Sequence, residues 1–157
     1  PTLLRAFSEL KSDANLILLV VGDGPLREEL QQMANELGIR EQVIWAGRTN
    51  NVYDHLCLMD VFALTSTYEG FGLVLLEALE ARLPVIAGNI SAIPEVLGQN
   101  YPGLVTPGSY QAFANKISEF LALDDEKMIG LEKIGQDRLV YFSALKMRQK
   151  VDEVYDN

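Results

Sequence analysis

Short apolar segments alternate with amphipathic segments along the whole chain, and this alternation restricts the fold more than any other feature. Residues 16–21, 42–45, 61–64, 84–87 and 104–105 have the composition of buried strands. Continuous apolar strands separated by helices are typical of a parallel sheet covered on both faces. We therefore predict an α/β fold, a Rossmann-like three-layer sandwich built on one parallel sheet.

The predicted helices carry the usual signals at their ends. One helix begins at Pro25 and stops at Gly38, the residue types common at the first helical position and just past the last. No linker-like composition or internal repeat interrupts the chain, so residues 1–157 are interpreted as a single domain. The other helices are expected at 1–10, 51–58, up to about 81 after the loop 65–72, at 94–97, and beyond 110 with breaks near 123–125 and 142–143.

Ligands of such folds bind at the carboxyl ends of the strands. The loops 22–25, 46–51, 65–72 and 88–94 each follow a predicted strand, so we expect them to share one rim. The loop that begins Gly22-Asp23-Gly24 resembles the start of a dinucleotide-binding fingerprint, but Arg27 stands where the third glycine belongs. A nicotinamide or flavin site is therefore disfavoured there, and a tight turn into a helix is the simpler interpretation.

The net charge of −9 limits the partners of this chain. An acidic surface repels phosphate backbones and anionic lipid, so we expect no nucleic-acid binding and no electrostatic membrane binding. The single Cys57 excludes an internal disulfide, and the single His55 excludes a multi-histidine metal site. We expect no metal and no cofactor. We also expect a cytoplasmic location, because the longest apolar run is far short of a membrane span and no signal peptide is visible.

The loop 69–72 and the helix after it carry the chemistry. Gly70 and Gly72 let the backbone approach a ligand closely, and the helix start offers unpaired N–H groups to an anion such as a phosphate. Glu69 and Glu77 are eight residues apart, about 12 Å along a helix, whereas a retaining glycosidase pair needs about 5 Å. They suit two hydroxyl groups of one extended ligand. A capping Glu69 and a solvent-exposed Glu77 without a ligand remain the alternative.

Glu77 favours a ligand role for a second reason. The helix that carries it is otherwise apolar, and a buried carboxylate is costly unless it is paired or bound.

The segment from Glu69 to Glu77 resembles the E-x₇-E signature of retaining glycosyltransferases with the two-domain GT-B architecture, in particular the large group 1 (GT4-like) family. The resemblance covers nearly the whole chain, and its motifs occur in the family's order. They are Val20–Pro25, Trp45–Gly47, Ala63–Ser66, Pro84–Ala87, Ile93–Val96, and the pairs Phe142-Ser143 and Val154-Tyr155 of the last helix.

This resemblance implies a role for each matching position. Glu69, the catalytic candidate, would contact the hydroxyls of the transferred sugar, and Glu77 the ribose hydroxyls. Backbone groups of Phe71, Gly72 and Leu73 would hold the diphosphate or sugar, and Gly47, Arg48 and Thr49 would line the base pocket. The donor would be a UDP-, GDP- or ADP-linked sugar. The acceptor would be a saccharide or a lipid-linked saccharide, as in polysaccharide biosynthesis, and the anomeric configuration would be retained without an obligatory metal.

The sequence departs from the family pattern in three ways. The Arg and Lys that grip the diphosphate in the family, and the first strand of the domain, would precede Pro1, and the N-terminal acceptor domain is absent from residues 1–157. We therefore expect a C-terminal donor-binding domain that is inactive alone, with peripheral membrane contact only through the absent domain. Arg82 occupies a position where the family usually has glycine, and it costs about 1 kcal/mol of stability if its backbone is left-handed. Ser91-Ala92 replace a Gly-Gly pair of the family.

Two other functions remain open at this point. A nucleotide-sugar 2-epimerase of similar architecture would bind a comparable donor. A flavodoxin-like binding module without catalysis would bind no nucleoside diphosphate.

Overall fold

The computed structural model describes residues 1–143, 146 and 148. Within them the strands are β1 (Leu18–Val21), β2 (Val43–Gly47), β3 (Phe62–Leu64), β4 (Val85–Gly88) and β5 (Leu104–Val105). The helices are α1 (Thr2–Ser8), α2 (Arg27–Glu36), α3 (Val52–Leu56), α4 (Leu73–Glu80), α5 (Ile93–Leu97), α6 (Tyr110–Leu121) and α7 (Asp125–Tyr141), with a 3-10 turn at Arg40–Gln42. The predicted order of strands and helices is confirmed.

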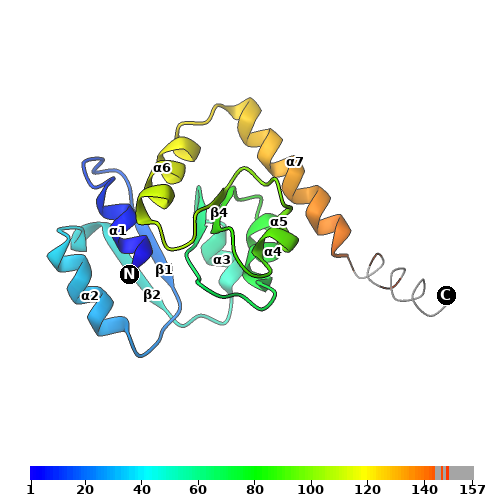
Figure 1. The fold of residues 1–157 in the computed structure, drawn as a ribbon. Coiled ribbons are helices and arrows are strands. Elements are labelled where there is room, and N and C mark those ends of the chain that lie inside the picture. Colours follow the sequence, from blue (N-terminus) through cyan, green and yellow to red (C-terminus); the bar gives the residue numbers. More distant parts are fainter. Residues whose placement is uncertain (144–145, 147, 149–157) are drawn as a thin grey trace.

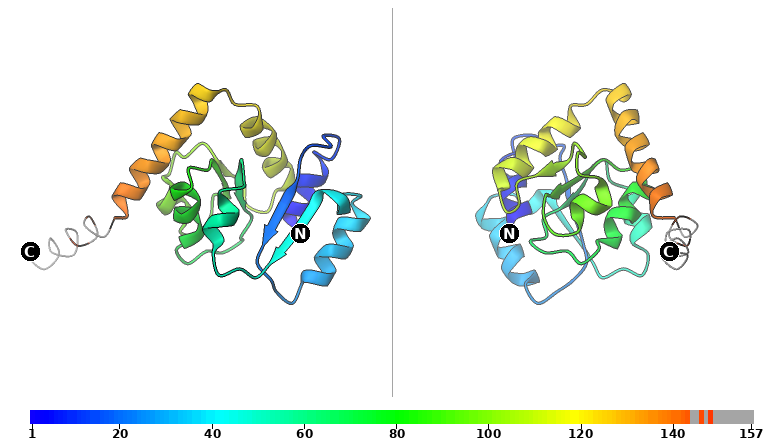
Figure 2. Two further views of the ribbon diagram at one scale, coloured as in Figure 1. Left: turned by 180° about the vertical axis from the view of Figure 1, so that it is seen from behind. Right: turned by 45° about the vertical axis from the view of Figure 1, so that its right-hand side comes forward.

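Strand β4 lies between two helical layers because its side chains alternate between two buried clusters. Val85 and Ala87 pack with residues of α4 and α5, while Ile86 packs with residues of α1 and α6. Figures 1 and 2 show the helices on both sides of the strands. This arrangement is the three-layer α/β sandwich expected from continuous apolar strands.

The strands pair in parallel, as predicted, but hydrogen bonding divides them into two sheets. β1 pairs with β2, and β4 pairs with both β3 and β5. Among the described residues no ladder joins β1 to β3. A largely apolar cavity of about 1030 Å³, lined by residues of both strands, lies between them and replaces the expected continuous sheet.

The two C-terminal helices begin at side-chain caps. The Ser109 hydroxyl accepts a hydrogen bond from the Ala112 N–H, and the Asp124 carboxylate accepts one from the Lys127 N–H. The latter bond holds the pKa of Asp124 below its usual range. Asp124 therefore caps the start of α7. Val154-Tyr155 lie outside the described residues.

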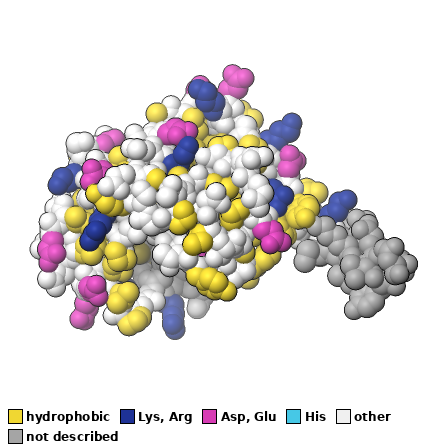
Figure 3. Space-filling view, viewed as in Figure 1, with side chains coloured by type: hydrophobic (Ala, Val, Ile, Leu, Met, Phe, Trp, Pro, Cys, Tyr) yellow, Lys and Arg dark blue, Asp and Glu magenta, His cyan; other side chains and the backbone are white. Residues whose placement is uncertain are grey.

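Two surface properties follow from this arrangement. None of the helices in the described part of the chain is both long and apolar enough to cross a membrane. On the face drawn in Figure 3, acidic side chains are scattered among basic ones rather than gathered into one patch.

Candidate functional site

The start of helix α4 is built around Gly72. This residue has φ +79° and ψ +52°, the left-handed region, and it is the N-terminal cap of the helix. A Cβ at this position would lie 2.9 Å from Leu75 Cδ1 and 3.1 Å from Glu69 Cγ. Glycine is therefore required both by the backbone angles and by the space.

The first turn of α4 presents hydrogen-bond donors. The Leu75 N–H bonds back to the Gly72 carbonyl oxygen at 2.9 Å, and the N–H groups of Leu73 and Val74 precede it in the turn. N–H groups at a helix start have no acceptor within the helix and carry a partial positive charge. This end of α4 therefore has the backbone donors that the predicted anion site needs.

The structure places Glu69 and Glu77 differently. Glu69 is partly buried in the loop, and its carbonyl oxygen accepts a hydrogen bond from the Ala92 N–H at 3.5 Å. Glu77 is exposed on α4. The argument that Glu77 is a costly buried carboxylate is thus wrong, because the helix turns this residue to solvent while Leu75, Ala78 and Leu79 face the core. An exposed carboxylate remains free to accept hydrogen bonds from a ligand.

The loops after β1 and β2 are tied together at the same rim. The Gly22 N–H donates to the Gly47 carbonyl oxygen at 2.8 Å. Arg48 is exposed and lines a cavity of about 400 Å³ with Asp23 and Gly24. The Thr49 hydroxyl is engaged locally, because it bonds both the N–H and the carbonyl oxygen of Asn51 at 3.1 Å.

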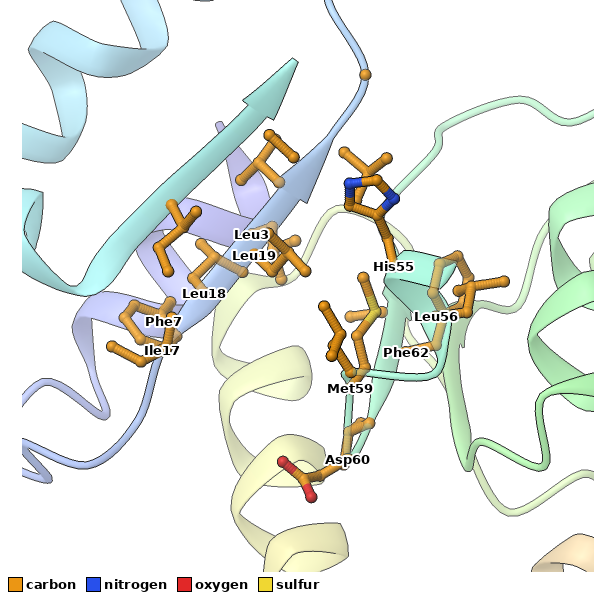
Figure 4. A pocket seen from close by; sticks show the side chains of 18 of the residues that line it. Leu3, Phe7, Ile17, Leu18, Leu19, His55, Leu56, Met59, Asp60 and Phe62 are labelled. Atoms are coloured by element: carbon orange, nitrogen blue, oxygen red, sulfur yellow. The ribbon is translucent and has the colours of Figure 1, made fainter. Parts of the chain in front are cut away.

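Part of the predicted site lines the larger cavity (Figure 4). Asp23, Arg48 and Thr49 from the loops after β1 and β2, and Val74 from the first turn of α4, are among its lining residues. Glu69, Phe71, Gly72, Leu73 and Glu77 are not among the residues that line either cavity. Arg48 and Thr49 of the predicted site thus line a cavity, and the predicted residues of the glycine loop do not.

Arg27 has a structural role that the sequence analysis missed. Its guanidinium lies 3.5 Å from the Asp23 carboxylate and donates to the Trp45 carbonyl oxygen at 3.5 Å. A Cβ at Gly47 would be 3.4 Å from Arg27 Nη1. The residue that breaks the dinucleotide fingerprint thus braces the two loops beside Arg48. The i, i+4 spacing of Asp23 and Arg27 was the available signal.

A second missed contact joins the glycine loop to the end of α7. The Phe71 ring packs edge-to-face on Phe142, with centroids 5.5 Å apart. Arg138 lies over the Phe142 ring and donates through Nε to the Val96 carbonyl oxygen at 2.8 Å. The resemblance assigns only backbone groups of Phe71 to the ligand, and this packing explains where its side chain goes.

Two departures from the family pattern adopt strained backbone. Arg82 has φ +61° and Ser91 has φ +53°, and both values lie in the left-handed region that favours glycine. These are the positions where the resemblance calls for glycine. Ser91 also lies next to Ala92, whose N–H bonds the loop at Glu69.

A metal site finds no support in this part of the structure. Among the described residues no three His, Cys, Asp or Glu side chains gather closely enough to hold a metal ion.

The fold and the site together define the class. The parallel α/β fold with a glycine-capped helix at the rim matches the C-terminal half of GT-B glycosyltransferases. One matching structure is the C-terminal domain of a group 1 glycosyl transferase (LpcC) from Francisella tularensis, at 26% identity and TM-score 0.77, covering 90% of this chain and 77% of that chain. Residues 1–137 match the family "Glycosyl transferases group 1". The chain belongs to this family, and the sequence-based identification is confirmed.

Two further similarities carry information on ligands. The chain is 35% identical over 130 residues to a GDP-mannose-dependent α-(1-6)-phosphatidylinositol monomannoside mannosyltransferase of Mycobacterium tuberculosis, covering 76% of this chain and 34% of that protein. It is similar to Anabaena Alr3699/HepE, solved in complex with UDP, at 25% identity and TM-score 0.80, covering 99% of this chain and 44% of that one. The chain therefore spans about a third of the length of the mycobacterial relative.

Proposed function

We propose that residues 1–157 form the donor-binding domain of a retaining glycosyltransferase, which moves a sugar from a nucleoside diphosphate to a saccharide or lipid-linked acceptor. The observation that carries the proposal is the start of α4, where left-handed Gly72 presents open N–H donors beside Glu69. A helix start of this kind favours a diphosphate even in an acidic protein, because backbone dipoles supply the positive charge.

The residues divide the donor between them. The N–H groups of Gly72 and Leu73 bind the diphosphate, Glu69 holds the hydroxyls of the sugar, and Glu77 accepts hydrogen bonds from the ribose. Arg48 and Thr49 lie beside the base. In the reaction the bond from the anomeric carbon to the diphosphate oxygen breaks, the acceptor oxygen takes its place, and the acceptor proton leaves with the diphosphate.

The contribution of the protein is positional and electrostatic. Fixed N–H donors stabilise the negative charge that grows on the departing diphosphate, and they need no rearrangement as the bond breaks. Holding the donor at the rim orients the anomeric carbon toward an acceptor bound by the rest of the polypeptide. The nucleotide base of the donor is left unassigned, because the similar proteins include a GDP-mannose-dependent enzyme and a complex with UDP. The exposed free thiol of Cys57 supports the proposed cytoplasmic location.

A thermal-shift panel of UDP, GDP and ADP on the complete protein tests the proposal. We expect one nucleotide to raise the melting temperature, because a ligand that binds the folded state stabilises it. Glu77→Ala should abolish this rise. Glu80→Ala is the matched control, because Glu80 is also exposed on α4, and it should leave the rise unchanged. A rise that survives Glu77→Ala would remove the ribose role.

Product analysis separates the alternatives. A transferase releases nucleoside diphosphate only when an acceptor sugar is present. A 2-epimerase converts the donor without an acceptor, and a non-catalytic module gives no nucleotide-dependent shift at all.

A further inference from the structure

Arg138, in the last turn of α7, ties this helix to the end of α5. Its Nε donates to the Val96 carbonyl oxygen at 2.8 Å, and its Nη2 donates to the Glu95 carbonyl oxygen. The last carbonyl groups of a helix have no donor within the helix and carry a partial negative charge. A planar guanidinium presents its N–H groups in a fixed fork, so Arg138 fixes the end of α5 relative to α7.

The same guanidinium also lies over two aromatic rings. Its Cζ is 4.6 Å from the ring centroid of Tyr141 and 5.3 Å from that of Phe142. The Phe142 ring in turn meets the Phe71 ring edge-to-face, with 5.5 Å between the centroids and 87° between the ring planes. Contacts of both kinds are attractive and depend on orientation. The side chain of Phe71 therefore rests on a ring that Arg138 holds in place.

Two routes thus lead from Arg138 to the glycine loop, residues 69–72. The first runs through Phe142 to Phe71, which directly precedes Gly72. The second runs through α5, because the N–H of Ala92, the N-terminal cap of this helix, donates to the Glu69 carbonyl oxygen at 3.5 Å. Both ends of the loop are therefore supported from α7, and both supports depend on one guanidinium.

The loop has little packing of its own to hold it. A Cβ at Gly70 would meet no atom within 4 Å, and the Phe71 side chain is 39% exposed although it packs on Phe142. A segment with few buried contacts opens readily unless a neighbouring element restrains it.

Helix α7 is firmly placed to give that restraint. Figures 1 and 2 show it running past α4 and α5. A Cβ at Gly135 would lie 2.9 Å from Leu79 Cδ2, so the two helices pack closely where they meet. The Gln136 side chain donates to the Leu79 carbonyl oxygen at 3.4 Å. Close packing leaves α7 little freedom to shift.

We propose that Arg138 is a positioning residue for the sugar donor, acting on the glycine loop through Phe142 and through α5. It does not itself bind the donor. It keeps Glu69 and the Gly72 N–H in the places where they meet the sugar and the diphosphate, and this inference rests on the proposed function. Misplacement of such groups by about 1 Å costs up to about a hundredfold in rate.

Arg138→Met in the complete protein tests the proposal, because methionine keeps the length of the side chain and removes its charge and N–H donors. The probe is the one of UDP, GDP and ADP that stabilises the unaltered protein. Its Kd, measured by titration calorimetry well below the melting temperature, should rise at least about fivefold. Lys133→Met is the matched control, because Lys133 is exposed on the same helix, and it should change Kd less than about twofold. A rise below fivefold in Arg138→Met overturns the proposal.

Steady-state kinetics separate positioning from a loss of folded enzyme. In Arg138→Met the donor KM should rise and kcat should fall. The acceptor KM should stay unchanged, because the rest of the polypeptide binds the acceptor. A smaller folded fraction lowers the apparent kcat and leaves both KM values as they were. That last pattern overturns the proposal.

Two substitutions of Phe142 decide the matter even if Arg138→Met does not fold. Phe142→Leu keeps an apolar side chain without the ring and should raise Kd at least about threefold, whereas Phe142→Tyr keeps the ring and should stay within about twofold. Equal Kd values for these two variants overturn the route through Phe71. Failure of all three nucleotides to bind the unaltered protein would overturn the proposed function as well. Binding that Arg138→Met leaves intact overturns this inference alone.

Discussion

Gly72→Ala is the substitution that most directly tests the construction of the site. An alanine at φ +79° is left-handed, which costs about 1–2 kcal/mol. Its Cβ would lie 2.9 Å from Cδ1 of Leu75, a fully buried side chain that has to move, and overpacking a core costs about 1–3 kcal/mol. Alanine also restricts the unfolded chain, which offsets about 0.4–1 kcal/mol. The expected net loss in the free energy of unfolding is about 3 kcal/mol.

Gly70→Ala is the matched control two residues away. Gly70 does not have a positive φ, and a Cβ there would meet no atom within 4 Å. Its substitution should change the free energy of unfolding by less than about 0.5 kcal/mol. The assay is urea denaturation of the complete protein, read as a change of midpoint at constant slope. The nucleotide-dependent shift should also fall in Gly72→Ala alone. Equal midpoints for the two variants would refute the requirement for glycine at the start of α4.

Two further substitutions test backbone strain and a buried hydrogen bond. Arg82→Gly should raise the free energy of unfolding by about 0.5–1 kcal/mol, because it relieves a left-handed arginine. The 3.9 Å ion pair of Arg82 with Glu132 is exposed, so its loss costs little. A lower free energy of unfolding in calorimetry would contradict this expectation. Tyr101→Phe should cost about 1–3 kcal/mol, because the Val85 N–H donates to the buried Tyr101 hydroxyl at 3.0 Å. Burial raises the pKa of Tyr101, so the folded protein favours the neutral phenol. The stability that this phenol contributes is fully present below about pH 10 and is lost as the pH rises further. Melting temperatures of Tyr101→Phe should lack that loss at high pH.

The sequence was most informative where a local rule has a single structural solution. Gly72 followed by an apolar helix predicted the glycine-capped start of α4, because a helix start depends on backbone geometry within a few residues. Arg82 and Ser91 were recognised as replacements of glycine, and their left-handed backbone follows from the fold that the resemblance implied.

Contacts between distant segments were beyond the sequence. The packing of Phe71 on Phe142 joins residues 71 positions apart, and no local pattern states which of several aromatic residues will meet. The exposure of Glu77 was misjudged for a related reason. An apolar helix has a buried stripe and a solvent side, and only the packing of α4 on its neighbours decides which residue lies on which.

The chain by itself thus determined the alternation of elements, their approximate bounds, the parallel pairing and the family, because each depends on periodicity or on motifs in a fixed order. Only the tertiary structure decided that the strands form two sheets with an apolar cavity between them, and that residues of the loops after β1 and β2 and of the start of α4 line this same cavity. Pairing between strands and meeting of loops depend on which surfaces come together in space, and a single sequence does not encode that geometry in any local pattern.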